Sequence, residues 1–140
     1  MLILLVLIYI LMEHKNGDGG NMKYYEAKNM LQLLNKMSVV DIAIPIKTGI
    51  RILQNKQLLI TAILPYNTIE NDVIKNYSNG KPSLTPEDEE YEVCSAKVND
   101  VLNEEVSGLE FDKINIDELA DLKLPMSAIT AIYPMLEVKE

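Results

Sequence analysis

The fold is decided by residues 77–105, YSNGKPSLTPEDEEYEVCSAKVNDVLNEE. Asn79-Gly80-Lys81-Pro82 is a turn sequence, and a helical pattern follows it. Thr85 is a favourable N-cap, Pro86 suits the first helical position, and the acids of Glu87–Glu90 suit a first turn because they meet the positive end of the helix dipole. A helix is predicted from Thr85 to about Glu105, with an apolar face formed by Tyr91, Cys94, Val98, Val101 and Leu102. The short break before it predicts an antiparallel helical hairpin.

The other helix of this hairpin is predicted to begin at Pro45. Aliphatic residues then recur at helical spacing, and we expect this row to be buried: Ile46, Ile50, Leu53, Ile60, Leu64, Ile69 and Val73. Pro65 lies within the pattern and predicts a kink or a break near Ile63–Leu64.

Two further helices are predicted on either side of the hairpin. Tyr24–Met37 carries one apolar stripe, formed by Tyr24, Ala27, Met30, Leu31, Leu34 and Met37. Pro125–Leu136 is the second helix, which Pro134 should shorten or kink. A single helical turn is expected at Asp117–Ala120.

Two short segments alternate in a way typical of strands. Val39–Ile44 is rich in β-branched residues, and Leu109–Ile116 alternates apolar and polar residues with a slip at Lys113. The two could pair, although two strands are marginal unless helices pack against them. The fold class expected is therefore mainly α, with α+β as the alternative: a helical hairpin, flanking helices and a small two-stranded β element.

Composition agrees with one globular domain spanning 22–140. The chain has 140 residues, of which 48% are hydrophobic, and it has no Trp and one Phe. A core of Leu, Ile, Val and Met suits helix packing. The single cysteine, Cys94, excludes an internal disulfide and fits a reducing compartment.

Residues 1–21 form an apolar leader with three competing interpretations. A helix over Met1–Met12 would be about 18 Å long, which is short of the roughly 30 Å hydrocarbon core of a bilayer. No basic region precedes it and no small-residue cleavage site follows, so a signal peptide is poorly supported. Gly19-Gly20 can be encoded by a ribosome-binding purine run, so one hypothesis is that translation begins at Met22. The alternative is a segment that packs on the protein or tethers it to a membrane.

The charge distribution argues against direct nucleic-acid binding. Nine Lys/Arg and six Asp/Glu occur up to Pro86, but four Lys and fifteen acids from Glu87 onward. Phosphate recognition normally needs a basic face, which this C-terminal half lacks.

No catalytic, cofactor-binding or metal-ligating residues are assigned. Glu87–Glu90 could bind a divalent cation or imitate DNA phosphates, but a favourable helix start accounts for them. A second acidic set lacks calcium-loop spacing and suits a solvated surface: Asp112, Asp117, Glu118 and Asp121. Cys94 lies on an apolar face, and the only histidine, His14, is in the leader, so neither a nucleophile–base pair nor a zinc site is predicted. We expect no enzymatic activity and no cofactor.

Residues 22–140 resemble a family of small uncharacterised proteins from tailed phages and prophages of Gram-positive bacteria. The resemblance rests on the order of five segments: KYYEAKNMLQLLNKM at 23–37, Ile44–Lys47, the turn with Asn79-Gly80, the acidic helix ending at Val101–Val106, and Phe111–Leu119 before a closing helix. The family lacks the leader. Leu58–Tyr66 departs from the pattern, because it is more apolar and contains Pro65. The resemblance implies a phage gene product, and no functional residue is carried over.

These observations lead to one function hypothesis and two alternatives. The leading hypothesis is a phage-type accessory protein that acts by protein–protein contact, as a virion component, an assembly factor or a modulator of a host protein. The partner is unidentified, and self-association through an apolar helical face is one option. The expected location is the cytoplasm of a bacterial host or the virion. The alternatives are an acidic DNA mimic that inhibits a host protein, and a protein tethered to a membrane by residues 1–12.

Overall fold

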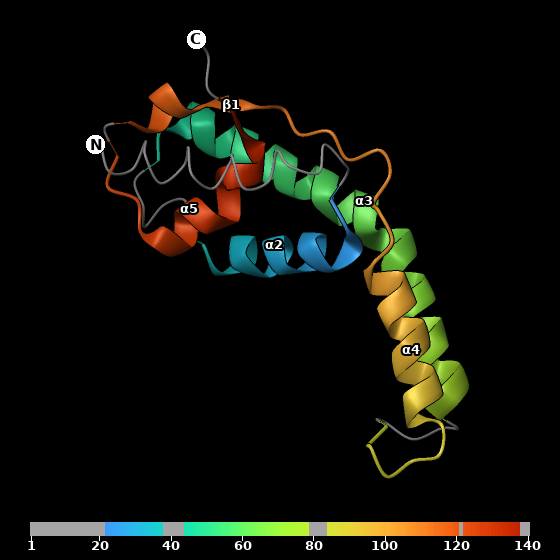
Figure 1. Ribbon diagram of the computed structural model, residues 1–140. Helices are drawn as coiled ribbons and strands as arrows, with labels where there is room; N and C mark the ends of the chain where they lie inside the picture. The colour runs from blue at the N-terminus through green and yellow to red at the C-terminus, as the bar shows by residue number, and fades with distance from the viewer. Residues whose placement is uncertain (1–21, 38–43, 79–83, 121, 138–140) are drawn as a thin grey trace.

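The computed structural model describes residues 22–37, 44–78, 84–120 and 122–137 (Figure 1). Within these ranges the chain is mainly helical, with four α-helices and a small parallel sheet, as expected. The α-helices are α2 (Tyr24–Lys36), α3 (Ile46–Ser78), α4 (Tyr91–Leu102) and α5 (Met126–Ile132). The predicted leader and most of the predicted strand at Val39–Ile44 lie outside the described residues.

Helix α2 follows its predicted apolar stripe closely. Tyr24, Ala27, Met30 and Leu34 are buried, and Leu31 and Met37 pack against the core. The first turn is held by the Glu26 carboxylate, which accepts a hydrogen bond from the backbone N–H of Lys23 at 3.1 Å. This helix packs against both α3 and α5.

Helix α3 runs for 33 residues and continues through Pro65. The predicted break at Ile63–Leu64 is therefore wrong, because a proline removes only one hydrogen bond of the helical ladder and the neighbouring bonds hold. The predicted alternative, a kink, agrees with Figure 1, in which α3 changes direction part-way along its length, as a proline-containing helix commonly does. Its first part lies over α2, and its second part lies beside α4.

The expected burial of the row along α3 is also wrong. The buried aliphatic residues of this helix are Ile52, Leu59 and Ile63, whereas Ile46, Ile50, Leu53, Leu64 and Ile69 are exposed. Helix α3 carries aliphatic residues on two sides, and its contacts with α2 and the C-terminal segment cover one of them.

Helix α4 forms the predicted antiparallel hairpin with α3, but it starts later than predicted. Thr85 does not act as a helix cap, because its hydroxyl and its backbone N–H both donate to the Asp88 carboxylate, at 3.3 and 2.7 Å. Asp88 N–H donates back to the Thr85 carbonyl at 2.9 Å, which closes a turn. The helix begins only at Tyr91 and ends at Leu102 rather than near Glu105.

The small sheet forms at the end of one predicted strand, Leu109–Ile116, but its partner strand is not the predicted one. Strand β1 (Ile114–Asn115) pairs in parallel with β2 (Leu136–Glu137), with Ile114 opposite Leu136. Residues 109–113 were predicted as strand but have no regular structure, because the Asn55 side chain takes both backbone polar groups of Asp112. The predicted C-terminal helix is shortened: α5 ends at Ile132, and a 3₁₀ turn, η2 (Tyr133–Met135), carries Pro134 into β2.

A 3₁₀ helix, η1 (Ile116–Leu119), lies where a single helical turn was expected. It is capped by Asn115, whose side chain accepts the Asp117 N–H at 3.0 Å.

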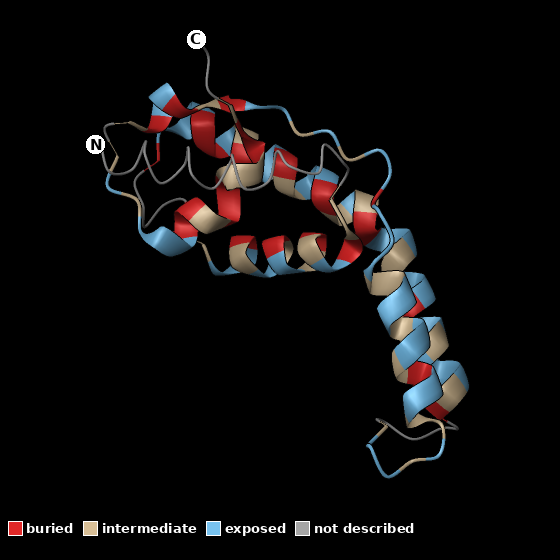
Figure 2. Ribbon diagram, in the orientation of Figure 1, coloured by how far each residue is buried: buried red, intermediate tan, exposed pale blue. Residues whose placement is uncertain are grey.

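The core lies between α2, α5, the first part of α3 and the small sheet, as the red segments of Figure 2 show. Among the described residues it is almost entirely aliphatic, with Tyr24 as the one buried aromatic residue. The distal part of the α3–α4 hairpin extends away from this core. Cys94 is the one buried residue of α4, as its place on the apolar face predicted. The rest of the predicted α4 face is half-buried.

Candidate functional site

The first part of α3 carries a row of aliphatic side chains on its solvent face. Ile46 is 81% exposed, Ile50 50%, Leu53 55% and Leu64 59%. Gln57, exposed, and Ile60, half-buried, complete the row. We call these six residues the α3 seam: Ile46, Ile50, Leu53, Gln57, Ile60 and Leu64.

The spacing of the α3 seam is that of a helix-packing surface. Successive members are separated by four, three, four, three and four residues, which keeps them on one side of a helix with 3.6 residues per turn. The buried residues Ile52, Leu59 and Ile63 occupy another side of the same helix. The chain has therefore used one apolar face of α3 for folding and left the second exposed to solvent.

A polar cluster connects α2 to α3 just after the last residue of the seam, Leu64. The Tyr24 hydroxyl is within hydrogen-bonding reach of the Asn67 side-chain oxygen and lies 3.0 Å from Oε1 of Glu70. Lys28 donates to both carboxylate oxygens of Glu70, at 2.9 and 3.0 Å, and its Nζ lies 5.2 Å from the centre of the Tyr24 ring. Burial, together with the hydrogen bond to Glu70 and the charge of Glu70, raises the pKa of the Tyr24 hydroxyl well above its usual value.

The Tyr24 ring also stacks on Tyr66, with ring centres 5.5 Å apart. The Tyr66 hydroxyl donates to the Glu105 carbonyl at 2.9 Å and accepts the Ser107 N–H at 3.3 Å. These bonds tie α2, α3 and the segment after α4 together. The polar groups of this cluster are bonded to one another or to the backbone, and they fix α2 and the segment after α4 against α3.

The acids of the C-terminal segment that sequence reasoning singled out fall into two places. Asp112 and Glu118 lie beside Arg51, whose guanidinium is 3.6 Å from Asp112 Oδ2 and 3.1 Å from Glu118 Oε2. This shallow polar depression also contains Lys113, Asn115 and Glu137. Asp117 lies in η1 next to it, and Asp121 is outside the described residues. Mixed charges that neutralise one another make this place an ion-pair network.

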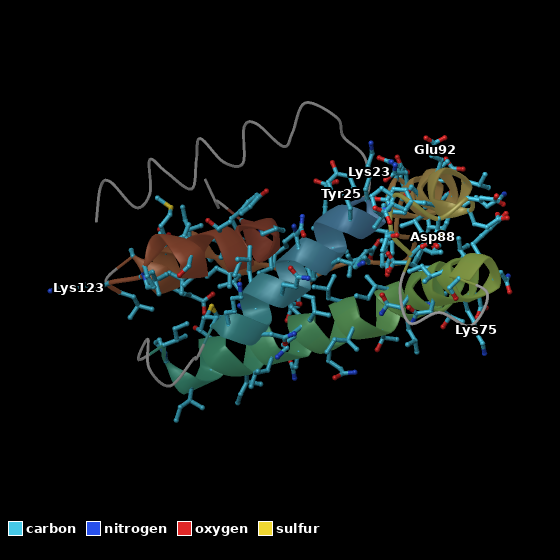
Figure 3. The ribbon with its side chains drawn as sticks, turned by 90° about the horizontal axis from the view of Figure 1, so that it is seen from below. Lys23, Tyr25, Lys75, Asp88, Glu92 and Lys123 are labelled. Atoms are coloured by element: carbon cyan, nitrogen blue, oxygen red, sulfur yellow. The ribbon has the colours of Figure 1, made fainter. Side chains whose placement is uncertain are left out.

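The acidic residues Glu87–Glu90 lie in the turns at the free end of the hairpin, near Tyr77 and Ser78. Figure 3 shows Asp88 and Glu92 on this part of the molecule, with Lys75 nearby. Among the described residues, no group of three or more His, Cys, Asp or Glu is arranged to hold a metal ion. None of the helices in the described ranges is long and apolar enough to cross a bilayer.

No family model, curated protein or solved structure matches this chain. Its most distinctive feature is the α3 seam, which sequence reasoning identified as a row but assigned to the core. The signal that could have revealed it is the presence of a second aliphatic series, Ile52, Leu59 and Ile63, out of phase with the first.

Proposed function

We propose that this chain is a phage- or prophage-type accessory protein that works by binding another protein along the α3 seam, without catalysing a reaction. Two things support the proposal. One is the exposure of the seam, and the other is the order of segments that resembles small phage proteins. The seam is the observation that carries it, because monomeric proteins seldom leave aligned aliphatic side chains open to water.

Covering the exposed side chains of the seam would release enough free energy to support a contact with another protein. Fully covering a Leu or Ile side chain contributes about 1.5–3 kcal/mol. Four side chains that are half-exposed or more, Ile46, Ile50, Leu53 and Leu64, therefore offer on the order of 5 kcal/mol from this side alone. Association costs consume several kcal/mol of such a gain. A partner that covers the seam with apolar groups of its own is therefore expected to bind reversibly.

The test is site-specific photo-crosslinking inside the bacterial host that carries the gene. A benzophenone amino acid replaces Gln57 in the seam or, as the control, the exposed Lys75 on the hairpin. We expect a discrete protein adduct from position 57, absent from position 75, that disappears when Ile50→Ser and Leu53→Ser are added. Adducts of equal yield at both positions, or none at position 57, would remove the basis of the proposal.

A second candidate function follows from the hairpin. Between Glu87 and Glu105 there are eight acids and one lysine, Lys97, and this segment belongs to the protruding part of the molecule (Figure 1). Such a surface supports the alternative of an acidic DNA mimic that occupies the basic groove of a host protein. Replacing Glu89, Glu90 and Glu92 by Lys should abolish inhibition of that protein. Inhibition that survived the triple change would exclude the mimic.

The remaining alternative, a membrane tether formed by residues 1–12, concerns residues that the structure does not describe. Fractionation of host cells would test it directly. Recovery of all the protein away from the membrane would remove it.

A further inference from the structure

Two lysines flank the α3 seam on opposite sides. Lys47 follows the seam residue Ile46, and Lys56 precedes the seam residue Gln57. Each residue of a helix is rotated by about 100° from the one before it. Lys47, one residue after a seam position, and Lys56, one residue before a seam position, therefore lie at opposite edges of the seam. Lys47 is exposed and Lys56 is half-buried. Neither makes an ion pair with another residue in the described part of the chain.

The surroundings of the seam contain no compensating acid on the same helix. From Ile46 to Ile69, α3 has three basic residues, Lys47, Arg51 and Lys56, and no Asp or Glu. Arg51 is already paired with Asp112 and Glu118. The seam is therefore a basic-edged strip on a protein whose net charge is −8.

We infer that the occupant of the α3 seam is an amphipathic helix of another protein, with an aliphatic row of the same spacing edged by Asp or Glu. This inference rests on the proposed function and specifies the partner. Aliphatic rows at alternating spacings of three and four interdigitate along two helices, and the charges at their edges select the partner. Carboxylates at those edges would meet Lys47 on one side and Lys56 on the other.

The same observations disfavour two other occupants. A second copy packed antiparallel, with Ile46 opposite Leu64, would bring the two Lys56 side chains together near the two-fold axis, and like charges there oppose association. An anionic membrane surface is repelled by the acidic remainder of the chain, and the seam lacks the Trp or Phe that commonly anchors interfacial helices.

The experiment uses the full chain and two synthetic helical peptides of about three heptads. Both peptides carry Leu and Ile at seam spacing, and they differ only in having Glu or Lys at the edge positions. Binding is followed by fluorescence anisotropy of the labelled peptide. At low salt we expect the Glu-edged peptide to bind at least about tenfold more tightly, and this preference to fall several-fold near 0.5 M salt because exposed charges are screened.

Matched variants of the protein separate the contribution of the edge charges from that of the aliphatic side chains. Lys47→Glu with Lys56→Glu should reverse the preference between peptides, whereas the same charge change on the hairpin, Lys75→Glu with Lys97→Glu, should leave it in place. Leu53→Ser with Leu64→Ser should abolish binding of both peptides, and circular dichroism should report an unchanged fold.

Several results would overturn the inference. Equal binding of the two peptides would remove the role of charge, and binding of neither would remove the acidic helix as occupant. Seam-dependent dimers in light scattering would identify a second copy instead. Seam-dependent flotation with phosphatidylglycerol vesicles would identify a membrane. If crosslinks from Gln57 in the host persisted in any of these cases, the proposed function would stand, while the acidic amphipathic helix would be excluded as the partner.

Discussion

The Asn55 side chain forms two hydrogen bonds with the backbone of one residue, Asp112. Its Nδ2 donates to the Asp112 carbonyl at 2.9 Å, and its Oδ1 accepts the Asp112 N–H at 2.8 Å. Asn55 is completely buried, and Nδ2 also lies 3.4 Å from the Met135 sulfur. The Asn55 amide thus pairs with both backbone polar groups of Asp112, as a neighbouring strand would in a sheet. It fixes that segment to α3 and so directs Ile114 into the core.

Asn55→Ala should destabilise the protein by about 1–3 kcal/mol, because it removes a completely buried amide together with both of its hydrogen bonds to the Asp112 backbone. Urea unfolding followed by circular dichroism measures the change. The control is Gln54→Ala at the neighbouring exposed position, which should change the free energy of unfolding by less than about 0.5 kcal/mol. Equal effects of the two substitutions would show that the paired hydrogen bonds do not stabilise the fold.

Leu59→Ala and Leu53→Ala compare the two aliphatic faces of α3. Leu59 is completely buried, so its truncation should cost about 2–5 kcal/mol. Leu53 is 55% exposed, and its truncation should cost no more than about 0.5 kcal/mol while weakening any partner that binds the seam. Denaturant titration of the two variants measures both values. A large loss of stability in Leu53→Ala would mean that the seam is a structural face of the monomer.

Tyr24→Phe keeps the buried ring but removes the hydroxyl that reaches Glu70, and it should cost about 1–2 kcal/mol at neutral pH. The pKa of Tyr24 is raised in the folded state, so the unfolded chain loses this proton first as pH rises past about 10. The stability that the hydroxyl provides is therefore complete below that pH and is lost above it. The difference in the free energy of unfolding between wild type and Tyr24→Phe should therefore shrink above that pH by roughly 1 kcal/mol per pH unit.

Urea titrations of wild type and Tyr24→Phe between pH 8 and about 11 would show this convergence. Other ionising groups affect both proteins alike and cancel in the difference. Tyr25→Phe, at a position that is 41% exposed, provides the control and should run parallel to wild type at all pH values. A gap between wild type and Tyr24→Phe that stayed constant would contradict the raised pKa.

Cys94 is 5% exposed and lies between α3 and α4, so its thiol should react slowly with an aromatic disulfide reagent in the native protein and rapidly in urea. Cys94→Ala should be tolerated at a cost of about 1 kcal/mol, because the thiol behaves as a small apolar group. The measurement is the rate of release of the coloured thiol, compared with that from the unfolded chain. Immediate reaction in native buffer would show that the hairpin opens readily.

Local sequence determined which segments of this chain became helices. The stripe of α2 was predicted nearly to the residue. The hairpin, a helical turn after Asn115 and the burial of Cys94 were also predicted, although α4 is shorter than expected. Each of these depends on spacings of three or four residues, or on a turn, and such relationships are complete within one short segment. The prolines acted within the predicted alternatives: α3 is bent but not broken at Pro65, and Pro134 lies in the 3₁₀ turn that shortens the last helix.

The partners of these segments were decided only by the tertiary structure. Asn55 meets Asp112 across 57 residues, and Glu70 meets Lys28 across 42. Strand β1 pairs with a strand whose first residue, Leu136, local pattern had assigned to the end of a helix. The same applies to the candidate site. Two aliphatic rows run along α3, and nothing within that helix distinguishes them. The one that became core is the one that α2 and the C-terminal segment cover, because burial is a property of the packed assembly and not of a single helix.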